Sequence, residues 1–202
     1  DMDQPLGYAV GNALEVKEAI ATLNGNGPED LRELVLVLTS LMVVKAGKAK
    51  DIREARILLE ETLDSGKALQ VMKEWIVAQG GTAEEVEHPD LLPQALCQEA
   101  VCAEKSGFVT KIHTEEIGRI CMLLGGGRAK KGDPIDLSVG LILRKKVGDP
   151  VHSGESLAIL HANDREKLAE AKERLLKAYE IKKEPVAVRP LIWEILDGTE
   201  AE

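Results

Sequence analysis

Apolar side chains recur at helical spacing through residues 12–79, in four segments that glycine-rich breaks separate. The first predicted helix begins at Asn12, an N-cap residue, and Glu15 three positions later would complete a capping box. The second helix follows Pro28, and the third follows Asp51, which again suits an N-cap. The fourth helix presents Leu69, Met72 and Ile76. This part of the chain is therefore predicted to be helical, without a complete sheet.

Glycines mark the expected ends of these helices, because glycine is the usual residue just past a helix C-terminus. They are Gly47, Gly66 and the pair Gly80-Gly81. The C-terminal half of the second helix is apolar nearly all round, which predicts burial between neighbouring elements. Its β-branched residues leave a strand as the lesser alternative.

Residues 82–98 have a different character. They combine four acidic residues with prolines and show little periodicity, which is typical of a connection between domains. We therefore predict a helical segment over 1–81, an acidic linker over 82–98 and a second domain over 99–202.

Beyond the linker the apolar pattern alternates with a period of two, as in half-buried strands. The predicted strands cover 99–103, 108–112, 137–143, 156–160, 186–188 and 191–195. Thr114 would cap a helix that runs to Leu124, and Asp164 would cap another that runs to about Tyr179. The second domain, and with it the whole chain, is predicted to be α+β.

Composition narrows the possible functions. The 202 residues are enough for one large domain or two small ones, and aromatic residues make up only 2%, so the core must be aliphatic. A net charge of −9 argues against a nucleic-acid partner, because no basic surplus exists to displace counterions from phosphates. The longest apolar run, 34–44, is too short to span a bilayer, so no membrane partner is predicted.

The three cysteines, Cys97, Cys102 and Cys121, are an odd number without CxxC spacing. This pattern fits reduced thiols and predicts a cytoplasmic location.

A loop between Gly7 and Gly11 is the first candidate for chemistry. Its backbone carbonyls cannot all be taken up by regular structure, and Glu18 lies nearby on the following helix. Carbonyl and carboxylate oxygens are the ligands that a hard cation prefers. On pattern alone, however, such a loop is more often only the connection into a helix.

A second glycine-rich segment, Gly125 to Arg128, has Lys130 and Lys131 beside it and suggests a phosphate cradle. It follows a predicted helix instead of leading into one, so no helix N-terminus is offered to an anion. A turn after the helix is the favoured interpretation.

Residues 147–158 resemble the hairpin of biotinyl and lipoyl carrier domains. Those carriers bear their cofactor on a lysine at the tip of the next turn. Here that turn reads His161-Ala162-Asn163-Asp164, and Lys167 falls inside the predicted helix. We interpret the segment as a carrier-like barrel that serves as a scaffold.

The remaining polar residues give weaker signals. No metal-ligand spacing relates the four histidines, His88, His113, His152 and His161, to one another or to the cysteines. Each is predicted to be a surface or hydrogen-bonded residue. Asp133 and Asp136 flank Pro134 and indicate turn formers, not an acid/base pair.

Several literal strings carry a more specific signal. They are Gln4-Pro5-Leu6-Gly7, Gly11-Asn12, Leu14-Glu15-Val16 through Glu18-Ala19-Ile20, Ala78-Gln79-Gly80-Gly81, Gly107-Phe108-Val109, Gly125 through Lys131, Asp133-Pro134-Ile135-Asp136, Lys145-Lys146-Val147-Gly148-Asp149, and Gly154-Glu155 to His161-Ala162-Asn163. Together they resemble the thymidine and pyrimidine-nucleoside phosphorylase family, in which the first of them lies near the middle of a longer chain. The resemblance covers nearly all residues and is weakest at 45–50 and 82–103. With an initial Asp in place of Met, it leads us to expect the C-terminal half of such an enzyme.

The resemblance implies a fold and an activity. The helical part would belong to the α/β domain that binds nucleoside and phosphate, and an α/β-hammerhead, carrier-like barrel-sandwich domain would follow. Family members phosphorolyse pyrimidine nucleosides to free base and pentose 1-phosphate, and they form homodimers. They hold phosphate with a Lys-His-Ser segment and a glycine-rich loop, and the base with a Tyr, an Arg and a Ser-x-x-x-Lys pattern. None of these strings occurs here, so no catalytic residue is predicted in this chain.

What the resemblance does carry over is half of the family's potassium site. Leu6 and Ala9 would supply backbone carbonyls, and Glu18 would supply its carboxylate. The competing hypothesis is a non-catalytic module that binds a partner or a small ligand through a biotinyl/lipoyl-like barrel.

Overall fold

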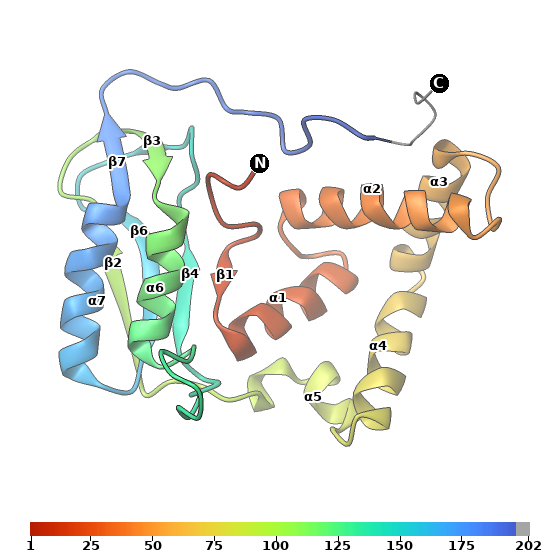
Figure 1. Ribbon diagram of the computed structural model, residues 1–202, viewed down its shortest axis with the longest axis horizontal. Helices are drawn as coiled ribbons and strands as arrows, with labels where there is room; N and C mark the ends of the chain where they lie inside the picture. The colour runs from red at the N-terminus through yellow and green to blue at the C-terminus, as the bar shows by residue number, and fades with distance from the viewer. Residues whose placement is uncertain (197–202) are drawn as a thin grey trace.

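The computed structural model describes residues 1–196 and has an α+β architecture. The helices are α1 (Asn12–Leu23), α2 (Glu29–Lys45), α3 (Ile52–Asp64), α4 (Lys67–Ala78), α5 (Ala83–Glu87), the short 3₁₀ helix η1 (Pro89–Leu91), α6 (Thr114–Leu124) and α7 (Arg165–Ala178). The strands are β1 (Ala9–Val10), β2 (Cys97–Cys102), β3 (Gly107–Ile112), β4 (Gly140–Leu143), β5 (Pro150–Val151), β6 (Ser156–Ala162) and β7 (Tyr179–Lys182). Helices α1 to α4 form one side of the molecule, and the strands with α6 and α7 form the other (Figure 1).

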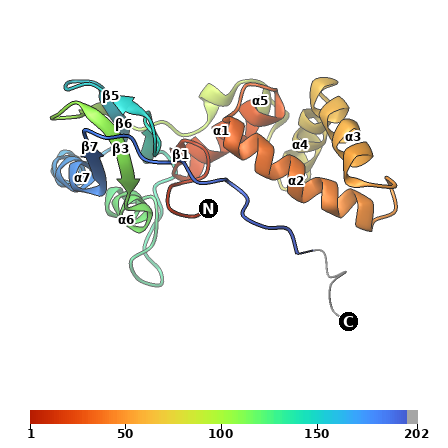
Figure 2. The same ribbon diagram turned by 90° about the horizontal axis from the view of Figure 1, so that it is seen from above.

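Two antiparallel sheets organise the strand-containing side. One has four strands in the order β1-β4-β6-β2, and the other has three in the order β5-β3-β7. Helices α6 and α7 lie on the same side of the four-stranded sheet, as both views show (Figures 1 and 2).

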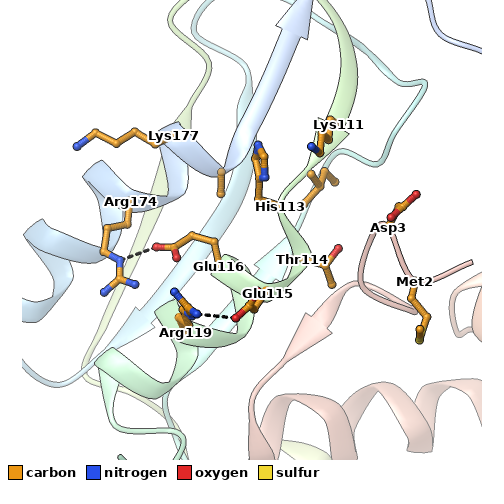
Figure 3. Close-up of a pocket in the computed structure, with 12 residues that line it drawn as sticks. Met2, Asp3, Lys111, His113, Thr114, Glu115, Glu116, Arg119, Arg174 and Lys177 are labelled. Atoms are coloured by element: carbon orange, nitrogen blue, oxygen red, sulfur yellow. Dashed lines mark hydrogen bonds and ion pairs between the residues drawn. The ribbon is translucent and has the colours of Figure 1, made fainter.

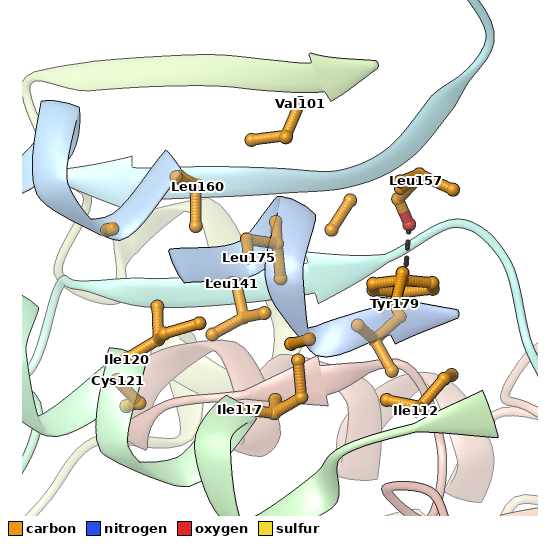
Figure 4. Packing of buried hydrophobic residues seen from close by; sticks show 14 of the residues in the cluster. Val101, Ile112, Ile117, Ile120, Cys121, Leu141, Leu157, Leu160, Leu175 and Tyr179 are labelled. Atoms are coloured by element: carbon orange, nitrogen blue, oxygen red, sulfur yellow. Dashed lines mark hydrogen bonds between the residues drawn. The ribbon is translucent and has the colours of Figure 1, made fainter. Parts of the chain in front are cut away.

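The main hydrophobic core fills the space between these helices and the sheets (Figure 4). Fully buried residues come from the four-stranded sheet (Val101, Leu141, Leu160), from α6 (Ile117, Ile120) and from α7 (Leu175). Tyr179 of β7 is also buried, and its hydroxyl donates to the carbonyls of Lys145 at 3.1 Å and Leu157 at 3.4 Å. The core is aliphatic, as the low aromatic content predicts.

Strand β1 joins the two sides of the molecule. Ala9 pairs with Ile142, and Val10 pairs with Leu141, at the edge of β4. The backbones meet most closely at two glycines, Gly11 and Gly140. The sequence pattern did not predict β1, because a strand of two residues leaves no periodicity to detect.

The N-terminus of α1 differs from the predicted capping box. Gly11 is the N-cap, and Asn12 is the first helical residue. The Glu15 carboxylate accepts from the N–H of Gly11 at 3.0 Å, one residue earlier than expected. Asn12 instead donates its side-chain amide to the carbonyl of Gly126 at 2.9 Å. The helix begins here because Gly11, with φ of +143°, turns the chain directly out of β1.

The other predicted helices form close to their expected bounds. Asp51 accepts from the N–H of Glu54 at 2.9 Å, and Asp164 accepts from the N–H groups of Glu166 and Lys167. Both N-caps are confirmed. Thr114 is wrong as a cap, because it is the first helical residue and its hydroxyl oxygen is buried without a partner among the described residues.

Helix α2 is less buried than its apolar sequence predicts. Leu36 is only 1% exposed, but Leu38 is 52% and Met42 is 69% exposed. Helix α3 is the main neighbour of α2, and within residues 1–196 no strand makes an extensive contact with α2. The predicted burial between neighbours is therefore wrong for this structure.

The acidic segment 82–98 contains more regular structure than predicted. Thr82 and Glu85 form a capping box at the start of α5, and Val86 is buried. Lys73 of α4 pairs with Glu87 at 2.8 Å. Since the capping box is local, it could have been found in the sequence.

Several strands differ from the predicted ones. The segment 186–188 and the segment 191–195 contain no strand, because β7 already pairs with β3 directly after α7. Residues 147–158 do not form one hairpin: β5 pairs with β3, whereas β6 pairs with β2 and β4. Strand β4 begins three residues later than predicted, since the Asp136 carboxylate bonds to Ser138 in a turn.

No helix in the described part of the chain combines the length and the apolar character needed to cross a membrane.

The contact between β1 and β4 leads to a stability prediction. Gly140 has φ of +149°, and a Cβ placed there would collide with the carbonyl oxygen of Val10. We expect Gly140→Ala to lower the free energy of unfolding by more than about 3 kcal/mol, measured by urea denaturation. Gly154→Ala is the matched control, since Gly154 also has positive φ, of +86°, but a Cβ there meets open space. Gly154→Ala should lower the free energy of unfolding by about 1–2 kcal/mol, the strain of a left-handed residue alone. Equal losses in the two variants would contradict the steric explanation.

Candidate functional site

The loop that precedes α1 folds back onto the side chain of Glu18. One carboxylate oxygen, Oε1, accepts from the N–H of Tyr8 at 2.8 Å and from the N–H of Ala9 at 3.0 Å. The other oxygen, Oε2, accepts no hydrogen bond within the described residues. Glu18 reaches the loop because it lies on the face of α1 that turns toward β1, which leads directly into that helix.

Gly7 is required for this approach. Its φ is +66°, and a Cβ on this residue would collide with Oε2 of Glu18. Its N–H donates to Oδ2 of Asp30, in the first turn of α2, at 3.1 Å. The loop is therefore held by carboxylates from two successive helices.

Lys146 reaches the same loop from the C-terminal part of the chain. It is only 9% exposed, and its Nζ donates to the carbonyl of Pro5 and to Oδ2 of Asp30, the latter at 3.0 Å. Nζ also lies 5.2 Å from the centre of the Tyr8 ring. The neighbouring backbone is fixed as well, since Gln4 accepts from the N–H of Val147 at 2.9 Å.

Charges of both signs surround the loop, namely the carboxylates of Glu18 and Asp30 and the ammonium of Lys146. Burial raises the pKa of Tyr8, and the carboxylates of Asp149, Asp30, Glu18 and Glu29 raise it further. Burial also raises the pKa of Glu18, against the lowering effect of the two N–H bonds and of the Lys146 ammonium. The carboxylates around Tyr8 would attract a cation, whereas the Lys146 ammonium opposes one.

A cavity of about 440 Å³ adjoins this loop. Its lining includes Tyr8, Ala9 and Glu18, together with the cationic side chains of Lys17 and Arg144. Of the predicted cation ligands, Glu18 accepts from the N–H of Ala9, not from its carbonyl side, and Leu6 lies in the same loop beside Gly7. Within residues 1–196, no group of three or more His, Cys, Asp and Glu side chains is arranged to hold a metal ion.

Comparisons with known proteins identify the two parts of the chain. Residues 108–182 match the pyrimidine nucleoside phosphorylase C-terminal domain, and residues 1–69 match the glycosyl transferase family a/b domain. The pyrimidine-nucleoside phosphorylase of Geobacillus stearothermophilus is 50% identical over 194 residues, which are 96% of this chain and 45% of the relative. The enzyme of the same name from Bacillus subtilis (strain 168) is 58% identical over 163 residues, which are 81% of this chain and 38% of the relative.

The chain belongs to the pyrimidine-nucleoside phosphorylase family. It spans less than half the length of these curated relatives.

The glycine-rich segment of this family member ends helix α6. Gly125 is left-handed, with φ of +110°, and its N–H donates to the carbonyl of Met122. The N–H of Gly126 donates to the carbonyl of Cys121 at 2.9 Å, which completes a Schellman motif. The favoured interpretation as a turn after a helix is confirmed. Its further role is to position α1, through the bond from Asn12 to Gly126.

The turn that carries the cofactor lysine in biotinyl and lipoyl carriers has a structural role here. Asn163 donates to Asp136 at 2.7 Å and to Ser138 at 2.9 Å, and it accepts from the N–H of Leu96 at 2.7 Å. Asp164 caps α7, and Lys167 lies in the first turn of that helix. These hydrogen bonds use the polar side chains of the turn, and no lysine stands at its tip to bear a cofactor.

Other polar groups form local pairs. A cleft of about 600 Å³ beside α6 and α7 is lined by charged residues that neutralise one another, including Arg174 with Glu116 at 2.6 Å and Arg119 with Glu115 at 2.5 Å (Figure 3). His113, also in this cleft, lies 3.0 Å from Glu180. These are solvated ion pairs, which contribute little to stability.

Most of the remaining predicted residues behave as expected from the sequence. His161 does not: it was predicted to be a surface or hydrogen-bonded residue, but it is only 7% exposed and its ring makes no hydrogen bond within the described residues. Asp133 and Asp136 each accept hydrogen bonds within a turn, which confirms them as turn formers. Burial lowers the pKa of His161, and burial raises the pKa of the Cys121 thiol to about 11. The described histidines and cysteines do not converge on a metal site.

Lys146 is the contact that sequence reasoning missed. In the sequence, Lys146 is distinguished only as part of the string Lys145 to Asp149, which resembles the phosphorylase family. Its partners Pro5 and Asp30 are 141 and 116 residues away, so no local pattern relates them.

The contact between Gly7 and Glu18 can be tested with a double-mutant cycle. We expect Gly7→Ala to reduce the free energy of unfolding by about 2–4 kcal/mol, through a steric clash added to left-handed strain. In a Glu18→Ala background only the strain remains, about 1–2 kcal/mol. The cycle, measured by urea denaturation, should give a coupling of at least about 1 kcal/mol. Additive effects would show that the carboxylate does not press against Gly7.

Proposed function

We propose that this chain is part of an enzyme that phosphorolyses pyrimidine nucleosides, converting uridine or thymidine and phosphate into free base and pentose 1-phosphate. The observation that carries the proposal is its identity of 50–58% to two enzymes named pyrimidine-nucleoside phosphorylase, over 81–96% of its length. The nucleoside and phosphate are its small-molecule partners.

The reaction defines what the complete enzyme must supply. An oxygen of phosphate forms a bond to C1′ of the pentose while the bond from C1′ to the base nitrogen breaks, and the electron pair of that bond leaves with the base. Donors must therefore hold the phosphate, and cationic or hydroxyl groups must stabilise the charge on the departing base. The strings that the family uses for both tasks do not occur in this sequence.

The part of the machinery that we assign to this chain is the potassium site. Its ligands would be the backbone carbonyls of Leu6 and Ala9 and the carboxylate of Glu18. Three observations support the assignment. Oε2 of Glu18 accepts no hydrogen bond within residues 1–196, several carboxylates surround Tyr8, and Gly7 lets the Glu18 carboxylate approach the loop. A bound potassium ion would supply positive charge and hold the loop in one conformation.

We further propose that residues 99–202 form an α/β-hammerhead, carrier-like barrel-sandwich domain that acts as a scaffold. Two antiparallel sheets and the match to the family's C-terminal domain over 108–182 support this. The helical residues 1–81 would belong to the nucleoside/phosphate domain, which the match over 1–69 supports, with 82–98 as the connection.

We expect the complete enzyme to be a cytoplasmic homodimer. The cysteines in the described part of the chain are free thiols, in keeping with a reducing compartment.

A second candidate is a non-catalytic binding module. It is favoured by the main core cluster, whose buried residues all come from 95–181 and do not depend on α2 to α4. An assay of free base released by this chain together with the missing part of the enzyme separates the two functions, because a binding module would not restore turnover.

The activity prediction is that the 202-residue chain alone releases no free base. Positioning phosphate and stabilising the leaving base each supply several kcal/mol of barrier reduction, and the residue strings for both are absent. Adding the part of the Geobacillus stearothermophilus relative that this chain does not span should restore measurable turnover. The readout is uracil or thymine released in phosphate buffer. Robust turnover by the chain alone would place the catalytic residues within it.

The cation prediction uses the same restored mixture. Glu18→Gln keeps the size of the side chain but removes the charge that attracts potassium. We expect it to raise the potassium concentration for half-maximal activity by at least about tenfold, since an interaction with a charged group contributes about 1.5 kcal/mol or more and 1.4 kcal/mol is about tenfold. Glu15→Gln, on the same helix, is the control and should leave the potassium requirement unchanged. An unchanged requirement in Glu18→Gln would remove this residue from the site.

A further inference from the structure

We propose that Lys146 is a positioning residue for the loop of residues 4–9: together with Asp30 it fixes the orientation of Leu6, and so links the C-terminal domain to the cation site. The functional meaning of this role rests on the proposed potassium site, whereas the positioning itself rests on contacts in the structure.

The contacts form a closed ring around Leu6. Nζ of Lys146 binds the carbonyl of Pro5, just before Leu6. Oδ2 of Asp30 binds the N–H of Gly7, just after Leu6, at 3.1 Å. The ring closes because the same Oδ2 accepts from Nζ of Lys146 at 3.0 Å. The two peptide units that flank Leu6 are thereby held by one ion pair.

This ring and Glu18 hold different halves of the loop. The Glu18 carboxylate fixes the N–H groups of Tyr8 and Ala9, but it makes no bond to the peptides on either side of Leu6. Among the described hydrogen bonds, only those of the Lys146–Asp30 pair reach the two peptides beside Leu6, while Gln4 is bonded separately to the N–H of Val147. A carbonyl that turns freely loses rotational entropy on binding a cation, so a fixed carbonyl is the better ligand.

Lys146 is itself held firmly enough to act as an anchor. Its own N–H donates to Oδ2 of Asp149 at 2.7 Å, and the next N–H, of Val147, donates to Gln4. The carbonyl of Lys145 accepts from the buried hydroxyl of Tyr179 at 3.1 Å, which ties this segment to the core. Because the ammonium is largely buried, removing its partners would leave a poorly solvated charge.

The chain provides a matched control in the preceding residue. Lys145 also binds one carboxylate and one proline carbonyl: Glu155 at 2.6 Å and Pro150 at 2.9 Å. These partners lie within the C-terminal part of the chain. Lys145→Met therefore removes the same chemistry as Lys146→Met without touching the loop.

The test measures amide hydrogen exchange in the 202-residue chain, by NMR, with the amide of Leu160 in the core as the reference for global unfolding. In Lys146→Met, the amide of Gly7 should exchange on the order of tenfold or more faster relative to Leu160, since its acceptor is no longer held. In Lys145→Met the exchange rate of the Gly7 amide, divided by that of the Leu160 amide, should stay within about threefold of the wild-type value. Lys146→Arg keeps the charge and should recover part of the protection.

Asp30→Ala provides a second variant if Lys146→Met does not fold. It removes the acceptor of Gly7 and the partner of Lys146 together, and should expose the same amide. Unchanged protection of Gly7 in Lys146→Met or Asp30→Ala would overturn the proposal, as would an equal loss in Lys145→Met.

The exchange experiment does not depend on catalysis. A failure of the restored mixture to release base would count against the proposed function and leave the positioning result intact. Restored turnover together with unchanged exchange of the Gly7 amide would support the proposed function and overturn the positioning role of Lys146.

Discussion

The contact between two glycines determines how the two sides of this molecule fit together. At Gly11 and Gly140 the backbones of β1 and β4 approach so closely that neither position has room for a Cβ. The N–H of Leu143 then donates to the carbonyl of Tyr8 at 2.8 Å, and the N–H of Ala13 donates to the carbonyl of Leu137 at 3.0 Å. These bonds place the start of α1, and with it Glu18, against the loop. This edge pairing therefore positions the half of the candidate site that Glu18 holds.

The second constraint is that the partly buried carboxylates of Glu18 and Asp30, close to that pairing, must be compensated. Burying a carboxylate costs free energy unless N–H groups or a cation compensate it. Backbone N–H groups of the loop compensate Glu18, and the Lys146 ammonium compensates Asp30. The loop is therefore shaped by its acidic neighbours as much as by its own glycines. This explains how a short irregular segment can keep a defined conformation without regular hydrogen bonding.

The helices α2 to α4 show the limit of reading burial from apolar content. Leu38 and Met42 belong to a run that predicts a fully buried helix, yet both are exposed here. Periodicity reports which faces are apolar, but it does not report what covers them. The match of residues 1–69 to an α/β domain is consistent with the apolar pattern, although no strand packs extensively on these helices within the described residues.

The sequence by itself determined the elements that local interactions control. Caps such as Asp51 and Asp164, and the glycine stop at Gly125, involve hydrogen bonds that span only a few residues, so their patterns are visible in the chain. Only the tertiary structure decided the short strands β1, β5 and β7, the displacement of the α1 cap to Gly11, and the ring formed by Lys146 and Asp30. Each of these depends on partners that are distant in sequence and are brought together only when the core forms. A two-residue strand or a single buried lysine leaves no periodic signal, and its role is fixed by what the rest of the fold places beside it.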